Sequence, residues 1–133
     1  MNIEELIIRL PEHADSRGVL CVAENHDLPF TVRRVFWIYD IESGQSRGGH
    51  AHTRCEEVVF AIHGSFDMII DDGTERACVR IDSPDKGIYI RKNVWCELTN
   101  FSPGTICMAL ASEPYDTDGY MKDYDEFLRS RHQ

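Results

Sequence analysis

Residues 44–64 of the chain, GQSRGGHAHTRCEEVVFAIHG, carry the pattern that decides the fold. His50 and His52 stand two positions apart, Glu57 follows five positions later, and a glycine closes each end. Side chains two residues apart on a strand point to the same face, so the two histidines are expected to point together into a cavity. Glu57 would reach the same cavity from the adjoining strand. Two imidazoles in a partly dry pocket can bind a metal or transfer protons.

The chain around this stretch reads as short strands separated by turn residues, with Asp71-Asp72-Gly73 as a hairpin signal. Residues 41–49 are rich in turn formers and are expected to form a loop. Short strands at this spacing favour an all-β sandwich or barrel. The expected strands are residues 31–40, 57–62, 65–70, 77–81, 87–90, 95–100 and 105–111.

The last part of the chain has a different pattern. In residues 120–129, Tyr120, Tyr124, Phe127 and Leu128 fall at i, i+4, i+7 and i+8. This spacing gives one apolar stripe of a short C-terminal helix, which we expect to pack on the outside of the β domain.

Length and composition predict one domain spanning residues 1–133, since 42% of the residues are hydrophobic. The net charge of −9 disfavours nucleic acid as a partner. No apolar run is long enough for a membrane span, and the acidic start, MNIEE, is unlike a signal peptide, so a cytoplasmic location is expected. Five cysteines without a CxxC pair argue against a disulfide framework or a zinc knuckle.

The spacing G-x5-H-x-H-x4-E-x6-G resembles the first motif of the cupins, at every fixed position. A second cupin motif usually supplies a histidine followed four positions later by asparagine, and here Cys96 precedes Asn100 by four. The corresponding metal set would be His50, His52, Glu57 and Cys96. Cysteine can ligate soft metals, so this set does not exclude a metal, although a lone cysteine is more often a core residue.

Nearly the whole chain also resembles one cupin family, the WxcM-like dTDP-4-keto-6-deoxyglucose 3,4-ketoisomerases of deoxysugar biosynthesis. The most diagnostic part is the tail, residues 115–127, which generic cupins lack. The other matching pieces are RRVFWIY (33–39), RGGHAH (47–52), DDG (71–73), DSP (82–84), GIY (87–89), VW (94–95) and LAS (110–112). The resemblance implies a cupin jelly roll, a homodimer, a nucleotide-diphosphate sugar as substrate, a place in surface polysaccharide (lipopolysaccharide) synthesis, and catalysis without a metal or other cofactor.

The resemblance carries proton shuttling over to His50 and His52, and it carries the motif arginine over to Arg47. The sequence departs from the family at Phe36-Trp37, where Tyr-Tyr is frequent, at Thr53, where Lys is frequent, and at Cys96, where His is frequent. Glu57, Cys96 and Asn100 are expected to line the substrate site. We expect Cys96 to form part of the pocket wall.

The implied reaction moves the ketone from C4 to C3 of the sugar. A neutral histidine would remove the C3 hydrogen, and protonation at C4 of the resulting enediolate would give the product. Arg47 or Tyr39 could stabilise the oxyanion. In strand alternation Tyr39 shares a face with Trp37 and Arg33, which are expected to contact substrate if that face lines the pocket. Packing is an equally open role for Tyr39.

Three other functions stay open at this point. A nucleotide-keto-sugar 3,5-epimerase would exchange protons at C3 and C5 without moving the ketone. A metal-dependent cupin enzyme would lose activity when stripped of metal. A non-catalytic sugar-binding cupin would be stabilised by ligand without turnover. The sequence does not decide which histidine acts on the carbon-bound proton, or whether the C4 product is galacto or gluco.

Overall fold

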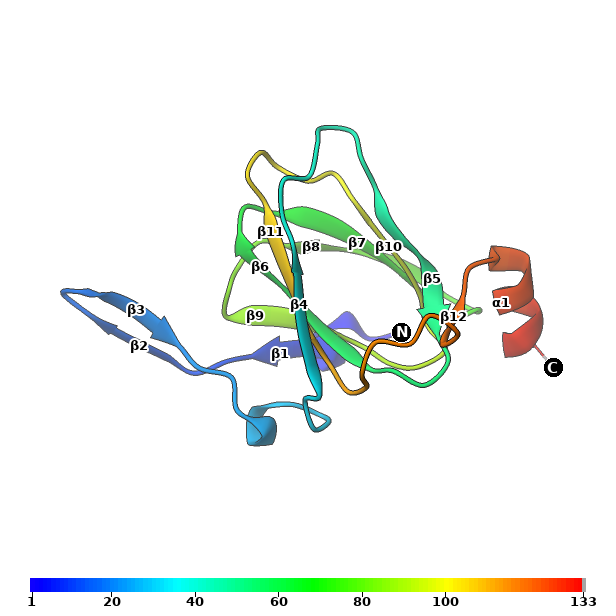
Figure 1. Cartoon of the computed structure of the whole chain (residues 1–133), viewed down its shortest axis with the longest axis horizontal. Helices are drawn as coiled ribbons and strands as arrows, with labels where there is room; N and C mark the ends of the chain where they lie inside the picture. The colour runs from blue at the N-terminus through cyan, green and yellow to red at the C-terminus, as the bar shows by residue number, and fades with distance from the viewer. Residues whose placement is uncertain (133) are drawn as a thin grey trace.

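The computed structural model describes residues 1–132, and two antiparallel sheets make up most of it (Figure 1). The first sheet has the strand order β1-β9-β6-β11-β4. Its strands are β1 (Ile7–Arg9), β4 (Arg34–Ile38), β6 (Glu57–His63), β9 (Lys86–Ile90) and β11 (Ile106–Ala111). Strand β4 lies at the edge of this sheet, so one row of its backbone groups is free of strand partners within the described part of the chain.

The second sheet has the order β12-β5-β10-β7-β8. Its strands are β5 (Arg47–His52), β7 (Phe66–Asp71), β8 (Arg76–Ile81), β10 (Trp95–Thr99) and β12 (Tyr120–Met121). A separate hairpin of β2 (Glu12–Asp15) and β3 (Gly18–Cys21) projects away from the two sheets, and α1 (Tyr124–Arg131) lies at the opposite end of the molecule (Figure 1).

The core fills the space between the sheets because strand side chains alternate between faces. In β7, Phe66, Met68 and Ile70 are buried, and they pack with residues of the opposite sheet such as Val59 and Ala109. A jelly roll of two packed antiparallel sheets follows, which confirms the all-β prediction. The strands expected from residue 57 onward up to residue 111 are all present, with ends that differ by one residue.

The C-terminal helix begins later than its hydrophobic spacing predicted. It starts after Asp123, whose side chain accepts hydrogen bonds from the backbone N–H groups of Asp125 and Glu126. Tyr120, expected in the helix, is instead the first residue of β12, where it pairs with His52 of β5. Tyr124, Phe127 and Leu128 do form the apolar face of α1, packed on Trp95 and Ala51.

Two further expectations about local structure were wrong. The expected loop 41–49 ends at residue 46, because β5 already begins at Arg47. The expected strand 31–40 is shorter, Arg34–Ile38, and strands β1, β2 and β3 were not foreseen. Within residues 1–132, no helix is long and apolar enough to cross a membrane. Residue 133, the end of the predicted domain, lies outside the described residues.

Candidate active site

A bulge between β5 and β10 sets the position of the histidine pair. His50 lies opposite Cys96, and the register shifts at the next residue so that Gly48 lies opposite Glu97. Gly48 has φ +82°, and a Cβ at this position would come within 2.9 Å of the Cys96 carbonyl oxygen. Only glycine therefore allows β5 to approach β10 this closely, and the approach turns His50 and Cys96 toward the same pocket.

His50 and His52 meet as the spacing predicted. Their ring centroids are 5.0 Å apart and the rings lie edge to face at 86°. His52 is only 4% exposed, and its Nε2 lies 3.3 Å from Oε2 of Glu57, the first residue of β6. Glu57 is itself 5% exposed, so its charge acts on the imidazole with little screening by water. The carboxylate stabilises His52 when that ring carries a proton.

The surroundings of His50 favour its neutral form. Burial is the largest cause that lowers the pKa of His50, and the neighbouring His52 and Lys122 lower it further. Glu57 and the backbone at Gly48 act in the opposite direction without reversing the shift. A neutral imidazole at physiological pH can accept a proton, which is the property that a general base requires.

The inward face of β4 carries Arg34, Phe36 and Ile38, the outward face carries Val35 and Trp37, and the exposed Tyr39 follows the end of the strand. The Arg34 guanidinium lies 3.9 Å from Oε2 of Glu57 and stacks over the Phe36 ring at 5.1 Å. Arg33 and Tyr39 were predicted to lie in the site, whereas the structure places Arg34, the neighbour of Arg33, there. Alternation along the strand defines the two faces, but it does not indicate which of them points inward.

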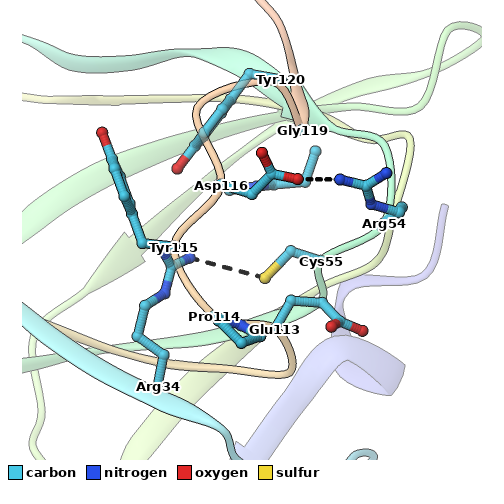
Figure 2. Close-up of a pocket in the computed structure, with 10 residues that line it drawn as sticks. Arg34, Arg54, Cys55, Glu113, Pro114, Tyr115, Asp116, Gly119 and Tyr120 are labelled. Atoms are coloured by element: carbon cyan, nitrogen blue, oxygen red, sulfur yellow. Dashed lines mark hydrogen bonds and ion pairs between the residues drawn. The ribbon is translucent and has the colours of Figure 1, made fainter.

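The opposite wall of the site comes from residues 113–123, here called the C-terminal strap. Its Tyr120 ring contacts both imidazoles, with centroid distances of 4.9 Å to His50 and 4.6 Å to His52. An ion pair between Arg54 and Asp116 holds the turn of the strap against the loop after β5 (Figure 2). Residues 115–127, which overlap the strap, were recognised as diagnostic of the family, but none of them was predicted to have a chemical role.

These elements enclose a pocket of about 530 Å³ between the two sheets. The pocket brings together most of the predicted site residues with several that were missed, and a smaller pocket of about 250 Å³ adjoins it behind Arg34 and Tyr120 (Figure 2). The lining residues of the larger pocket that were predicted from the sequence are Trp37, Arg47, His50, His52, Glu57 and Cys96. Lining residues that were not predicted include Arg34, Tyr115 and Tyr120.

Three predicted site residues do not line this pocket. Arg33 is exposed, with its guanidinium 3.8 Å from the Glu113 carboxylate. Tyr39 is 61% exposed, just beyond the end of β4. Asn100 lies beyond β10 at φ +56°, and its side-chain amide donates a hydrogen bond to Asp67. Asn100 therefore serves the turn that follows β10 in this chain.

The side chains of the site do not fit the cupin metal set. Burial raises the pKa of the Cys96 thiol, so this side chain stays protonated and is a poor metal ligand. A tighter group of possible ligand atoms, from His52, Cys55 and Glu57, lies within 4.8 Å. However, the Arg34 guanidinium lies 3.9 Å from both the Cys55 sulfur and the Glu57 carboxylate, where it would repel a divalent cation.

Comparisons with known proteins agree with this geometry. Residues 2–132 match the family described as "FdtA: WxcM-like, C-terminal". A curated TDP-4-oxo-6-deoxy-alpha-D-glucose-3,4-oxoisomerase from Aneurinibacillus thermoaerophilus is 38% identical over 128 residues, which cover 96% of this chain and 92% of that protein.

Two solved structures show the same likeness. The TDP-quinovose 3,4-ketoisomerase from Campylobacter jejuni superposes with a TM-score of 0.89 at 42% identity, covering 92% of this chain and 95% of the other. A variant 3,4-ketoisomerase from Thermoanaerobacterium thermosaccharolyticum, solved with TDP-4-keto-6-deoxyglucose, gives a TM-score of 0.91 at 29% identity and covers 94% of this chain and 91% of the other.

Proposed function

Since the chain belongs to the WxcM-like family of TDP-sugar 3,4-ketoisomerases, we propose that it moves the ketone of a TDP-4-keto-6-deoxyhexose from C4 to C3 in deoxysugar biosynthesis. The observation that carries this proposal is the His50–His52 pair, which faces a pocket large enough for a sugar and stands against the buried carboxylate of Glu57. Family membership favours this reaction over the 3,5-epimerase, the metal-dependent enzyme and the sugar-binding module.

The two histidines take different roles in this proposal because their surroundings differ. His50, whose pKa is lowered, removes the proton from C3 as the neutral base. His52, whose Nε2 lies 3.3 Å from the Glu57 carboxylate, donates the proton to C4. Ketone migration is an internal redistribution of electrons within the sugar, so the balance of the reaction requires no external oxidant or reductant. The faces from which the protons leave and arrive determine the configuration at C4.

The substrate carries two phosphates, and the pocket offers two arginines for them. Arg34 lies inside the pocket and Arg47 lies at its rim, in a chain whose net charge is −9. Guanidinium groups form paired hydrogen bonds with phosphate oxygens, so a local cationic site overcomes the repulsion by the acidic surface.

Cys96 also lines the pocket and would contact substrate, whereas Trp37 borders the pocket from the outward face of β4. A nucleotide-sugar substrate supports the expected cytoplasmic location.

A homodimer fits the apolar surface that the monomer leaves uncovered. Trp37, on the outer face of edge strand β4, is 60% exposed, and Tyr39, just after the strand, is 61% exposed. On the projecting hairpin, Val19 and Leu20 are each 62% exposed. A second copy of the chain could pair with the free edge of β4 and cover both patches. Light scattering during size-exclusion chromatography should give a mass near twice the monomer's 15.3 kDa, and a monomer at micromolar concentration would contradict the dimer.

The test of function is incubation with TDP-4-keto-6-deoxyglucose in heavy water, followed by NMR of the sugar. We expect a 3-keto product that carries deuterium at C4. Deuterium at C3 and C5 with the ketone still at C4 would instead establish the epimerase. Activity that disappears with a chelator and returns with added metal would establish the metal-dependent enzyme. If the substrate raises the melting temperature but no product forms, the protein is a non-catalytic sugar-binding module.

A further inference from the structure

Ketone migration moves protons on oxygen as well as on carbon, and the histidine pair accounts only for the carbon side. When C3 loses its hydrogen, the C4 carbonyl oxygen becomes negative and needs a hydrogen-bond donor. When C4 gains hydrogen, the C3 hydroxyl must lose its proton. Because C3 and C4 are bonded, one donor placed beside both oxygens can serve both events. Tyr39, predicted for this task, does not line the pocket.

Tyr120 lies where such a donor is needed. Its ring packs edge to face against His50 at 87° and tilts at 46° against His52, with both centroids within 5 Å. A substrate carbon in reach of both imidazoles is therefore also next to this side chain. Figure 2 shows the ring extending from the strap into the pocket, with its hydroxyl turned toward Tyr115 and bonded to none of the residues drawn.

We propose that Tyr120 is a further catalytic residue, whose hydroxyl passes a proton to the C4 oxygen and receives one from the C3 oxygen. This inference rests on the proposed function, since it assigns the oxygen-side chemistry of the same reaction. Tyrosine suits the task because its hydroxyl both donates and accepts. Tyr115 also lines the pocket, but it is 70% exposed and its ring lies over Arg34 instead of the histidines.

The proton and electron balance closes over one turnover. His50 takes the C3 proton, the electrons of the C3–H bond form the C3–C4 double bond, and the C4 oxygen takes the proton of Tyr120. The C3 hydroxyl then returns a proton to Tyr120 as the C3 carbonyl forms, while C4 takes a proton from protonated His52. Tyr120 ends as it began. His50 then gives its proton to solvent water and His52 takes one from solvent, which restores the starting state and lets deuterium from heavy water reach C4.

The strap holds Tyr120 firmly enough for this role. Tyr120 is the register partner of His52, so its backbone is fixed to the strand that carries the histidines. The residue before it, Gly119, accepts hydrogen bonds from the backbone N–H of Thr53, at 3.0 Å, and from its hydroxyl, at 3.3 Å. Because these bonds join the strap to the loop directly after β5, Tyr120 moves with the histidine pair.

The test compares Tyr120→Phe, which removes only the hydroxyl, with Tyr124→Phe as the matched control. Tyr124 lies four residues later, and its hydroxyl bonds to Asp71 outside the pocket. We expect Tyr120→Phe to lower kcat roughly 10²-fold, the typical effect of losing one oxyanion donor, with KM and inhibition by TDP little changed. Tyr124→Phe should keep the wild-type kcat. Melting temperatures and circular dichroism of all three proteins establish that they fold.

The outcomes separate this inference from the function on which it rests. If the wild type converts TDP-4-keto-6-deoxyglucose and Tyr120→Phe keeps its kcat, the hydroxyl has no catalytic part and the inference is wrong. Tyr120→Leu then tests the role of the ring. If kcat falls in Tyr120→Leu but not in Tyr120→Phe, the ring positions the histidines and the hydroxyl has no part. If the wild type forms no 3-keto sugar at all, the proposed function fails first.

Discussion

Strand β5 and the C-terminal strap face each other across the same pocket, and they are built in different ways. Strand β5 is hydrogen-bonded along both edges, to β10 and to β12, and His52 within it is buried. The strap contributes only the two residues of β12 to a sheet, and otherwise it is held by turns, an ion pair and the helix that follows it. The histidine pair thus stands on the side that is hydrogen-bonded along both edges, and the side that covers it depends on attachments at its ends.

The difference teaches where support for a catalytic geometry comes from. Substitutions on β5 should remove chemistry while leaving the fold intact, because the strand's backbone bonds do not depend on its side chains. Substitutions that loosen the strap should act through position, since Tyr120 reaches the histidines only while the strap stays docked. The predictions below test this contrast, beginning with the largest expected effect.

The largest effect is expected on the β5 side. His50→Asn and His52→Asn each keep a polar side chain of similar size but remove the basic imidazole, so turnover should fall about 10²–10⁴-fold, the usual contribution of a general acid or base. His26→Asn is the matched control, because this histidine is exposed on a short turn outside the pocket. Steady-state rates and melting temperatures of the three variants make the comparison. Wild-type rates in both pocket variants would contradict the proposed chemistry.

The contrast between the two regions also explains what the sequence could predict. His50 and His52 follow a fixed spacing on one strand, so their meeting depends only on strand geometry, and it was correctly foreseen. Glu57 was expected on the adjoining strand, but β6 belongs to the opposite sheet, and its carboxylate reaches His52 across the space between the sheets. Tyr120 fits a helical stripe with Tyr124 equally well, and only its pairing with β5, a contact between residues 68 positions apart, excludes the helix. Sequence periodicity does not contain that information.

The choice of face on β4 failed for a related reason. Alternation separates the Arg33–Tyr39 set from the Arg34–Ile38 set, but it does not say which set faces inward. The outward set carries large aromatic side chains, and aromatic side chains in a strand are readily predicted to line a pocket. In this protein they are exposed, and they fit the proposed contact with a second copy of the chain. Large aromatic side chains on the exposed face of an edge strand therefore mislead predictions made from the sequence alone.

The second prediction concerns helix α1, which anchors the C-terminal end of the strap. Phe127 of α1 is fully buried against Trp95, and Phe127→Ala should lower the free energy of unfolding by about 3–5 kcal/mol. Catalysis should also fall, by up to about 10²-fold, because small displacements of pocket groups are costly in rate. Chemical denaturation and rates measured below the melting transition separate the two effects. Leu128→Ala, at a partly buried neighbour, is the milder control. An unchanged kcat in folded Phe127→Ala would show that strap and helix are uncoupled.

The third prediction concerns the effect of a charged residue of the strap, Lys122, on the pKa of His50 in β5. Because the pKa of His50 is lowered, its neutral form persists to lower pH, and the acid limb of kcat/KM should have its midpoint below the ordinary histidine value of 6.5. Lys122 of the strap contributes to that lowering, so Lys122→Gln should move the midpoint of the limb to higher pH, and added salt should reduce the difference between the two proteins. Arg129→Gln, on the exposed part of α1, should leave the midpoint unchanged. A limb that moves downward in Lys122→Gln would contradict His50 as the titrating base.

The smallest effect is expected at Cys96, next to His50 on the β5 side of the pocket. Burial raises the pKa of this thiol, so it is uncharged and protonated when the enzyme works, and it neither accepts a proton nor binds a metal as thiolate. Cys96→Ser should therefore keep kcat within about twofold, and the buried hydroxyl should cost roughly 1 kcal/mol of stability. Elemental analysis of both proteins completes the measurement. A variant that loses both bound metal and turnover would make Cys96 a ligand, restore the metal-dependent alternative, and move the source of catalysis from the imidazole pair to the metal set of His50, His52, Glu57 and Cys96.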